Sequence, residues 1–400
     1  MYPTNDSYLG YIKLNRTTVN NDLISDKADQ GAAVRYYGLD ALRAVAMALG
    51  IVLHASLPYF NTYEIWPSDD GESLAIWVVF EFIHIWRMPL FFILGGFFGA
   101  LVVQRRSWKW YRNQRWRRIG LPLIVFLPLI ALVMPYIWLY GLQGSIKGGV
   151  EIESYFNPWH LWFLFHLLTF VIVMAIWNMS RQLFSKLIPS ETIRIVWQSS
   201  ARTFLRAIYF PVPFALGVIL MIVLIPSGAE LIGNPLASFT YFLFGYGLFH
   251  RASLMKSIKH YWAAYIVTGS VGFIVYLWIV PQVTDIYNSG GENAGLGLLF
   301  IGLKVVCAVT FSLGLIGFAE QHLNTYNSRW RWLADSSYWV YLSHLPIVTF
   351  VTFLMFNISA PYEIKFLIAI FITCLLTLVT YRFFIRRTFA SVFLNGRRYE

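Results

Sequence analysis

Long apolar runs separated by short polar segments dominate the chain from residue 39 to residue 385. Ten of these runs have roughly the length that an α-helix needs to cross a hydrocarbon core of about 30 Å. They are continuously apolar, whereas the strands of a membrane β-barrel alternate between apolar and polar positions. The pattern predicts an all-α, polytopic integral membrane protein with about ten transmembrane helices, at residues 39–61, 74–101, 119–140, 158–178, 207–226, 235–250, 261–281, 294–317, 338–356 and 364–385.

Charge divides the polar segments into two alternating classes. The segment between the second and third runs, "QRRSWKWYRNQRWRR", holds seven Lys and Arg residues and no acid, while "TYEIWPSDDGES", between the first two runs, is acidic. Because short cytoplasmic loops retain Lys and Arg, this alternation predicts that both termini are cytoplasmic. Residues 1–35 are polar and lack the apolar core of a signal peptide, so we interpret them as a disordered cytoplasmic leader. Residues 36–386 then form the transmembrane domain and residues 387–400 a basic cytoplasmic tail.

Composition supports the membrane assignment and bears on the kind of partner. Hydrophobic residues make up 58% of the chain and charged residues 13%, against roughly 25% charged residues in soluble proteins. The net charge of +11 does not indicate a nucleic-acid partner, because the basic residues lie at the ends of apolar runs. Topology and anionic lipid headgroups account for that placement. Cys307 and Cys374 both lie within apolar runs and show no disulfide or metal-binding spacing.

The first apolar run carries Arg43 and His54. Arg43 precedes His54 by eleven residues, which is roughly 16 Å along a helix and about 20° around it, so both point to nearly the same side. An ionisable group at bilayer depth costs several kcal/mol unless it is paired or hydrated, which makes each of them a candidate functional residue. The alternatives are that Arg43 is a topological anchor and that His54 makes a helix-packing hydrogen bond.

The second run carries Glu81, His84 and Arg87, spaced three residues apart and therefore on one face of a helix. In a functional interpretation the carboxylate orients a histidine, or the guanidinium binds an anion, in the same cavity as His54. In a structural interpretation the three side chains neutralise one another and position the helix. The sequence leaves both open.

Further polar side chains occur at the ends of other runs. Arg115 and Arg118 share one helical face just before the third run, and forked guanidinium groups suit phosphate oxygens. His160 and Trp162 open the fourth run, where an interfacial aromatic belt is the alternative explanation. His344 lies in the ninth run, two residues before Pro346, and its alternative role is to satisfy backbone groups that the proline frees.

No motif indicates a metal, a phosphate-binding loop or a serine nucleophile. No histidine pair has the H-x3-H or HExxH spacing, and neither a Gly-rich phosphate loop nor a G-x-S-x-G elbow occurs. We therefore expect no metal site, although five of the histidines in the apolar runs make one conceivable: His54, His84, His160, His166 and His344.

Five motifs in order give the chain a family resemblance. The R-x10-H pair of the first run is followed by "RMPLFFILGGFF", "RWRRIGLP", "HLWFL" and "SYWVYLSHLPI". Together they resemble the membrane acyltransferase-3 superfamily over residues 36–386. The chain is most similar to its glucan-modifying members, whose "YFLD-x-R" and "FIH-x-x-R-M" motifs match "YYGLDALR" and "FIHIWRM" apart from the inserted Gly38.

The resemblance implies transfer of an acyl group from cytoplasmic acyl-CoA to hydroxyls of an extracytoplasmic glycan, in the bacterial inner membrane. For the glucan-modifying members it implies succinyl-CoA as donor and a periplasmic glucan as acceptor. His54 would be the general base, with direct transfer in a ternary complex. The remaining expected site residues are Glu81 and His84 for catalysis, Arg43, Arg115, Arg118 and His344 for the CoA donor, and Arg87, His160 and Trp162 for the substrate.

Two other classes of function use the same polar residues. A secondary transporter of an organic anion would use Arg43 and His54 as its intramembrane anion and proton site. A flippase for lipid-linked sugars is the third candidate, but the acid-free arginine loop favours a ligand of the CoA type. The oligomeric state stays open.

Overall fold

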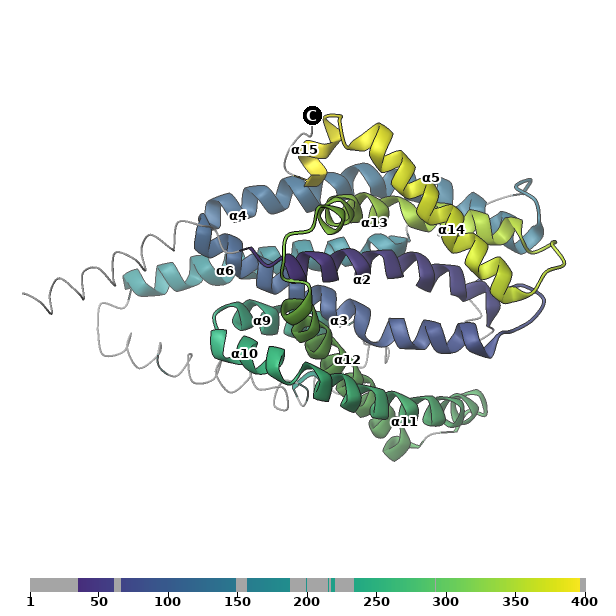
Figure 1. Ribbon diagram of the computed structural model, residues 1–400, viewed down its shortest axis with the longest axis horizontal. Coiled ribbons are helices and arrows are strands. Elements are labelled where there is room, and N and C mark those ends of the chain that lie inside the picture. The colour runs from purple at the N-terminus through teal and green to yellow at the C-terminus, as the bar shows by residue number, and fades with distance from the viewer. Residues whose placement is uncertain are drawn as a thin grey trace, which may run out of the picture. The chain divides into compact units, whose positions relative to one another are not determined.

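The computed structural model describes residues 35–60, 66–148, 157–187, 199, 215, 217–219, 234–291 and 293–395. Its contacts divide the chain into Met1–Tyr37, of which three residues are described, and Gly38–Glu400, in which the site lies. The described residues form helices and no strands. The first half comprises α2 (Tyr37–Ser56), η1 (Leu57–Tyr59), α3 (Leu74–Arg105), α4 (Trp108–Arg115), η2 (Trp116–Gly120), α5 (Leu121–Gln143), η4 (Trp159–Leu161) and α6 (Trp162–Leu187) (Figure 1).

The second half continues with helices of more varied length. It comprises α9 (Pro235–Phe249), α10 (Ala252–His260), α11 (Trp262–Asn288), α12 (Ala294–His322), α13 (Ser328–Leu354), α14 (Tyr362–Thr380), η5 (Tyr381–Ile385) and α15 (Ala390–Asn395). Side chains at several helix starts accept hydrogen bonds from the backbone N–H groups of the first turn, as N-caps do. These caps are Ser73, Ser107, Asn234, Asn293 and Asn327.

Eight helical segments of the described chain are long and apolar enough to cross a membrane, and they coincide with eight of the ten predicted spans. The predicted span 235–250 is α9, whose 15 residues reach only about 22 Å. The predicted span 207–226 lies outside the described residues except at 215 and 217–219. The all-α polytopic fold is therefore confirmed, while the orientation of the termini stays a prediction.

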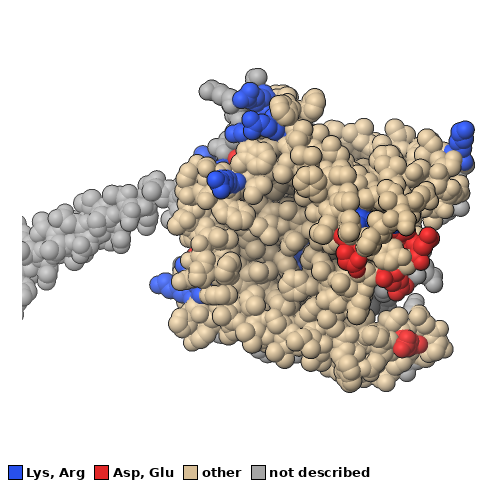
Figure 2. Space-filling model, turned by 45° about the vertical axis from the view of Figure 1, so that its right-hand side comes forward, with Lys and Arg blue, Asp and Glu red and all other residues tan. Residues whose placement is uncertain are grey.

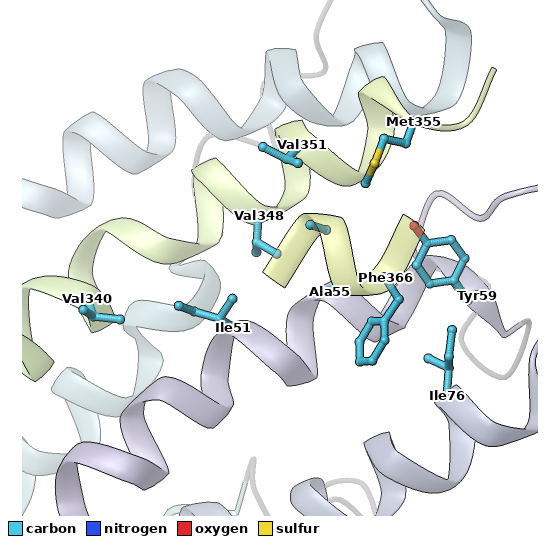
Figure 3. Packing of buried hydrophobic residues seen from close by; sticks show 10 residues of the cluster. Ile51, Ala55, Tyr59, Ile76, Val340, Val348, Val351, Met355 and Phe366 are labelled. Carbon is cyan, nitrogen blue, oxygen red and sulfur yellow. The ribbon is translucent and has the colours of Figure 1, made fainter. Parts of the chain in front are cut away.

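Helix α2 is packed on several sides by helices from distant parts of the chain (Figure 1). One buried cluster joins it to α3, α13 and α14, and Figure 3 shows the side chains converging from these helices. Small residues allow the close approach. A Cβ on Gly38 would collide with the carbonyl oxygen of Ala319 on α12. A Cβ on Gly96 of α3 or on Gly245 of α9 would likewise collide with a backbone carbonyl of the other helix. The cluster comprises Ile51, Ala55, Tyr59, Ile76, Val340, Val348, Val351, Met355, Phe366 and Ala369.

The segment from Trp66 to Ser73 ties the end of α2 to the start of α14. The backbone N–H of Asp69 donates to the carbonyl of Pro58 at 2.9 Å. The Asp69 carboxylate pairs with Lys365 at 2.8 Å, with 2% and 5% of the two side chains exposed. Figure 2 shows Asp and Glu gathered at one end of this face, with most Lys and Arg at the opposite end. This is the charge asymmetry that the positive-inside rule expects.

Lys365→Met is expected to destabilise the protein by about 3–5 kcal/mol, because it leaves a buried carboxylate without its cation. Thermal unfolding in detergent measures the loss as a lower Tm. Lys256→Met removes an exposed lysine on α10 and is the matched control. Equal Tm values for the two variants would contradict a stabilising role for the Asp69–Lys365 pair.

Candidate functional site

A cavity of about 120 Å³ lies between α2, α3, η4–α6 and α13. It brings together four of the histidines from the apolar runs and Arg87, and we call it the histidine chamber. Of the predicted site residues it contains His54, His84, Arg87, His160, Trp162 and His344. Met47, Gly50, Leu53, Met88, Phe91, Phe163 and Tyr341 complete its lining.

Three of the histidines form a contiguous row of rings. The ring of His344 lies 5.3 Å from that of His54 and 5.1 Å from that of His160, between centroids. The Tyr341 hydroxyl donates to the carbonyl of His160 at 2.7 Å and so ties α13 to η4. The row therefore joins three segments that are far apart in the sequence. In the described part of the chain, no three potential ligand side chains are grouped closely enough to hold a metal ion.

His344 has a fixed orientation. Its Nδ1 lies 2.7 Å from the carbonyl oxygen of Tyr341 and 3.1 Å from that of Val340. Neither is the carbonyl that Pro346 frees, which belongs to Leu342 four residues earlier. The alternative suggested by the proline therefore does not describe this side chain. Its Nε2 is buried and has no hydrogen-bond partner among the described residues.

Arg87 lines the chamber without a carboxylate within ion-pair distance among the described residues. Its Nη1 and the Nε2 of His344 converge beside Gly50. A Cβ on that glycine would lie 2.7 Å from the first nitrogen and 3.3 Å from the second. An unneutralised guanidinium at this depth favours an anion or a developing negative charge in the chamber.

A second cavity, of about 160 Å³, adjoins the histidine chamber, and we call it the arginine vestibule. Arg43, Arg115 and Arg118, all predicted to bind the donor, line it together with Asp335 and Tyr338. Three apolar side chains line both cavities, so the boundary between them is uncharged. These are Met47, Phe91 and Phe163.

Arg118 is positioned by the C-terminal helix α15. Its Nε and Nη2 donate to the carbonyl of Leu394 at 3.2 and 2.8 Å, and its own carbonyl accepts from the Tyr338 hydroxyl. Arg118 lies within η2, a π-helical turn between α4 and α5, and such turns are frequent at functional sites. Arg115 packs over the ring of Tyr111, 5.1 Å from its centroid.

Glu81 lies outside the chamber, on the face of α3 that packs against α11 and α12. Its carboxylate accepts a hydrogen bond from the Tyr276 hydroxyl at 2.7 Å, and Lys304 interacts electrostatically with it and with His84. The structure thus gives Glu81 partners other than the chamber histidines. Lys304 was missed in the sequence, although a lone lysine in the apolar run 294–317 was a signal for it.

Three tryptophans form a cluster beside His54. The ring of Trp66 stacks on His54 with centroids 6.1 Å apart. Trp138 lies 4.5 Å from Trp66 and 4.9 Å from Trp159. Trp159 has a positive φ of 48°, a strained conformation for a bulky residue. Trp66 thus lies beside His54, the chamber residue of α2 that is furthest along the helix from Arg43 of the vestibule. Sequence reasoning missed Trp66, which gave no signal beyond its place in an acidic loop.

Residues 36–382 match the acyltransferase-3 family, described as "Acyltransferase domain". The chain belongs to the acyltransferase-3 family. This confirms the resemblance drawn from the five motifs. Similar acyltransferase-3 proteins include the "Glucans biosynthesis protein C" of Salmonella paratyphi A (strain ATCC 9150 / SARB42), Salmonella agona (strain SL483) and Salmonella typhi. Each is 28% identical over 341 residues, covering 80% of this chain and 83% of the relative. No solved structure matches the chain significantly.

Gly50→Ala is expected to suppress acyl transfer without unfolding the protein. The new methyl would stand 2.7 Å from Nη1 of Arg87 and 3.3 Å from Nε2 of His344, and displacing a catalytic group by about 1 Å costs about a hundredfold in rate. The measurements are the transfer rate and the Tm in detergent.

Gly302→Ala on α12 is the control, since a Cβ there meets nothing within 4 Å. If Gly50→Ala transferred the acyl group at the wild-type rate, the reaction would not use the space beside Gly50.

Proposed function

We propose that this acyltransferase moves a succinyl group from cytoplasmic acyl-CoA to hydroxyls of an extracytoplasmic glycan, a periplasmic glucan, across the bacterial inner membrane. The observation that carries the proposal is that the arginine vestibule adjoins the histidine chamber and shares three lining residues with it. The names of the relatives support a glucan as the acceptor.

The vestibule suits the phosphate-bearing end of CoA. Arg43, Arg115 and Arg118 line the vestibule together with Asp335, which pairs with Arg331 at 3.2 Å. Arg43 pairs with Asp40 at 3.2 Å, so Arg115 and Arg118 carry most of the positive charge that phosphates would meet. Guanidinium forks bind phosphate oxygens more specifically than single charges do. The apolar side chains between the two cavities oppose entry of the CoA phosphates, which carry several charges, because burying a charge there is costly. The donor would thus enter with its acyl end leading, and Arg87 would offset the single charge of the succinyl carboxylate.

Arg87 supports an acyl group that ends in a carboxylate. It lies in the chamber, beyond the apolar side chains that separate the chamber from the vestibule, and no carboxylate of the described chain neutralises it. The free carboxylate of a succinyl group would supply that charge and form a bidentate contact. A neutral acyl group would leave the guanidinium without a counter-ion.

The chemistry requires a base for the acceptor hydroxyl. His54 would accept the hydroxyl proton while the oxygen attacks the thioester carbonyl, which forms the C–O bond and breaks the C–S bond. His84, His160 and Trp162 line the same chamber and would hold the substrates. Holding both substrates in one cavity converts a bimolecular reaction into an effectively unimolecular one.

Purified protein incubated with labelled succinyl-CoA and glucan is expected to place label on the glycan. His54→Ala should lower the rate by about a hundredfold or more, because the proton acceptor is lost. His260→Ala removes an exposed histidine at the end of α10, outside the chamber, and is the control. Uptake of an organic anion into vesicles without any acyl transfer would favour the transporter instead.

The double variant Arg115→Gln/Arg118→Gln is expected to raise KM for acyl-CoA by about tenfold or more at unchanged kcat, since phosphate contacts are lost away from the reacting atoms. Arg112→Gln/Arg117→Gln is the matched control. It removes the same charge from the same loop at exposed positions outside the vestibule. An equal rise in KM for both variants would show that Arg115 and Arg118 contribute only their positive charge, with no specific contact to the donor.

A further inference from the structure

Helices α2 and α13 each line both cavities, so position along either helix measures depth from the vestibule. On α2, Arg43 lines the vestibule and His54 the chamber. On α13, Tyr338 lines the vestibule and His344 the chamber. Along both helices, increasing residue number therefore leads from the vestibule to the chamber.

His344 lies closer to the vestibule than His54 does. Its Nε2 is level with Gly50, since a Cβ there would lie 3.3 Å from it. Gly50 precedes His54 by four residues, which is about 6 Å along the helix. His54 has its ring stacked on Trp66 at the opposite end of the chamber. The two imidazoles thus lie at different depths: His344 is nearer the vestibule, at which the donor would enter, and His54 is nearer Trp66.

The two imidazoles also differ in how they are held. The carbonyls of Val340 and Tyr341 can only accept hydrogen bonds, so the Nδ1 of His344 carries the hydrogen. The buried Nε2 of neutral His344 then carries a lone pair and can accept a proton. The Nδ1 of His54 is buried without a described hydrogen-bond partner, so its tautomer is not set by a neighbouring group. His344 can therefore pick up and release a proton at one defined atom.

We propose that His344 is a second catalytic histidine, which delivers the proton to the departing CoA thiolate. The proposal rests on the proposed acyl transfer. The acceptor oxygen bonds to the thioester carbon as its proton moves to His54, and the electron pair of the C–S bond goes to sulfur. The proton then passes from His54 to Nε2 of His344, whose ring centroid is 5.3 Å away, and from there to the sulfur. Both imidazoles end neutral, and the products are the ester and the free thiol.

Leaving-group dependence tests this role. The probes are two succinyl thioesters without a nucleotide, one of N-acetylcysteamine and one of thiophenol, whose more acidic thiol departs without help. His344→Asn retains an amide N–H for the carbonyl of Tyr341 but lacks the Nε2 position. It is expected to slow transfer from the alkyl thioester by about a hundredfold and to leave transfer from the aryl thioester near the wild-type rate. His54→Ala should slow both thioesters alike, since its role concerns the acceptor hydroxyl.

His260→Asn is the matched control, because this histidine is exposed at the end of α10 and lines neither cavity. If His344→Asn does not fold, His344→Gln makes the same comparison. Equal slowing of both thioesters would overturn the inference, and so would a raised KM for succinyl-CoA at unchanged kcat, which would make His344 a donor-binding residue. If the wild-type protein transfers from none of the thioesters, succinyl-CoA included, the proposed function itself is refuted. If the wild-type protein does transfer and His344→Asn shows equal slowing or only a raised KM, the role of His344 alone is refuted.

Discussion

The guanidinium of Arg87 lies within a membrane-spanning helix, and no carboxylate of the described chain neutralises it. At that depth a charge is tolerated where it faces a polar cavity or an anion. The packing of α2, α3, α6 and α13 provides such a cavity, lined by four histidines. Apolar contacts between α2, α13 and α14 stabilise these helices away from the chamber, so the polar groups remain available for ligands instead of holding the fold together.

Two adjoining cavities of different character follow from this arrangement. The vestibule gathers guanidinium groups, whose attraction for phosphate does not require complete removal of water. The chamber is bounded by Met47, Phe91 and Phe163 on the vestibule side and by Trp66 beyond His54. In the proposed function, donor binding and chemistry would thereby be separated along α2 and α13.

Close helix packing decides how tightly these groups can converge. Gly50 brings Nη1 of Arg87 and Nε2 of His344 to one point, which a side chain would occupy. Gly38, Gly96 and Gly245 play a different part, since they let helix backbones touch and so fix the distances between α2, α3, α9 and α12. In a bilayer, where lipid tails compete with apolar side chains, such backbone approach is a main source of helix association.

The sequence by itself determined the properties that depend on neighbouring residues. Hydropathy is local, so the spans and the all-α class were predictable, and helical periodicity placed Arg43 and His54 on one face of a single helix. The motif order indicated the family. Only the tertiary structure decided which helix each face meets. It turned Glu81 toward Tyr276, placed His344 between His54 and His160, and held Arg118 on the carbonyl of Leu394. Periodicity orients a side chain around its own helix axis, but its partners come from helices distant in the sequence, whose packing depends on side-chain shape across the whole bundle.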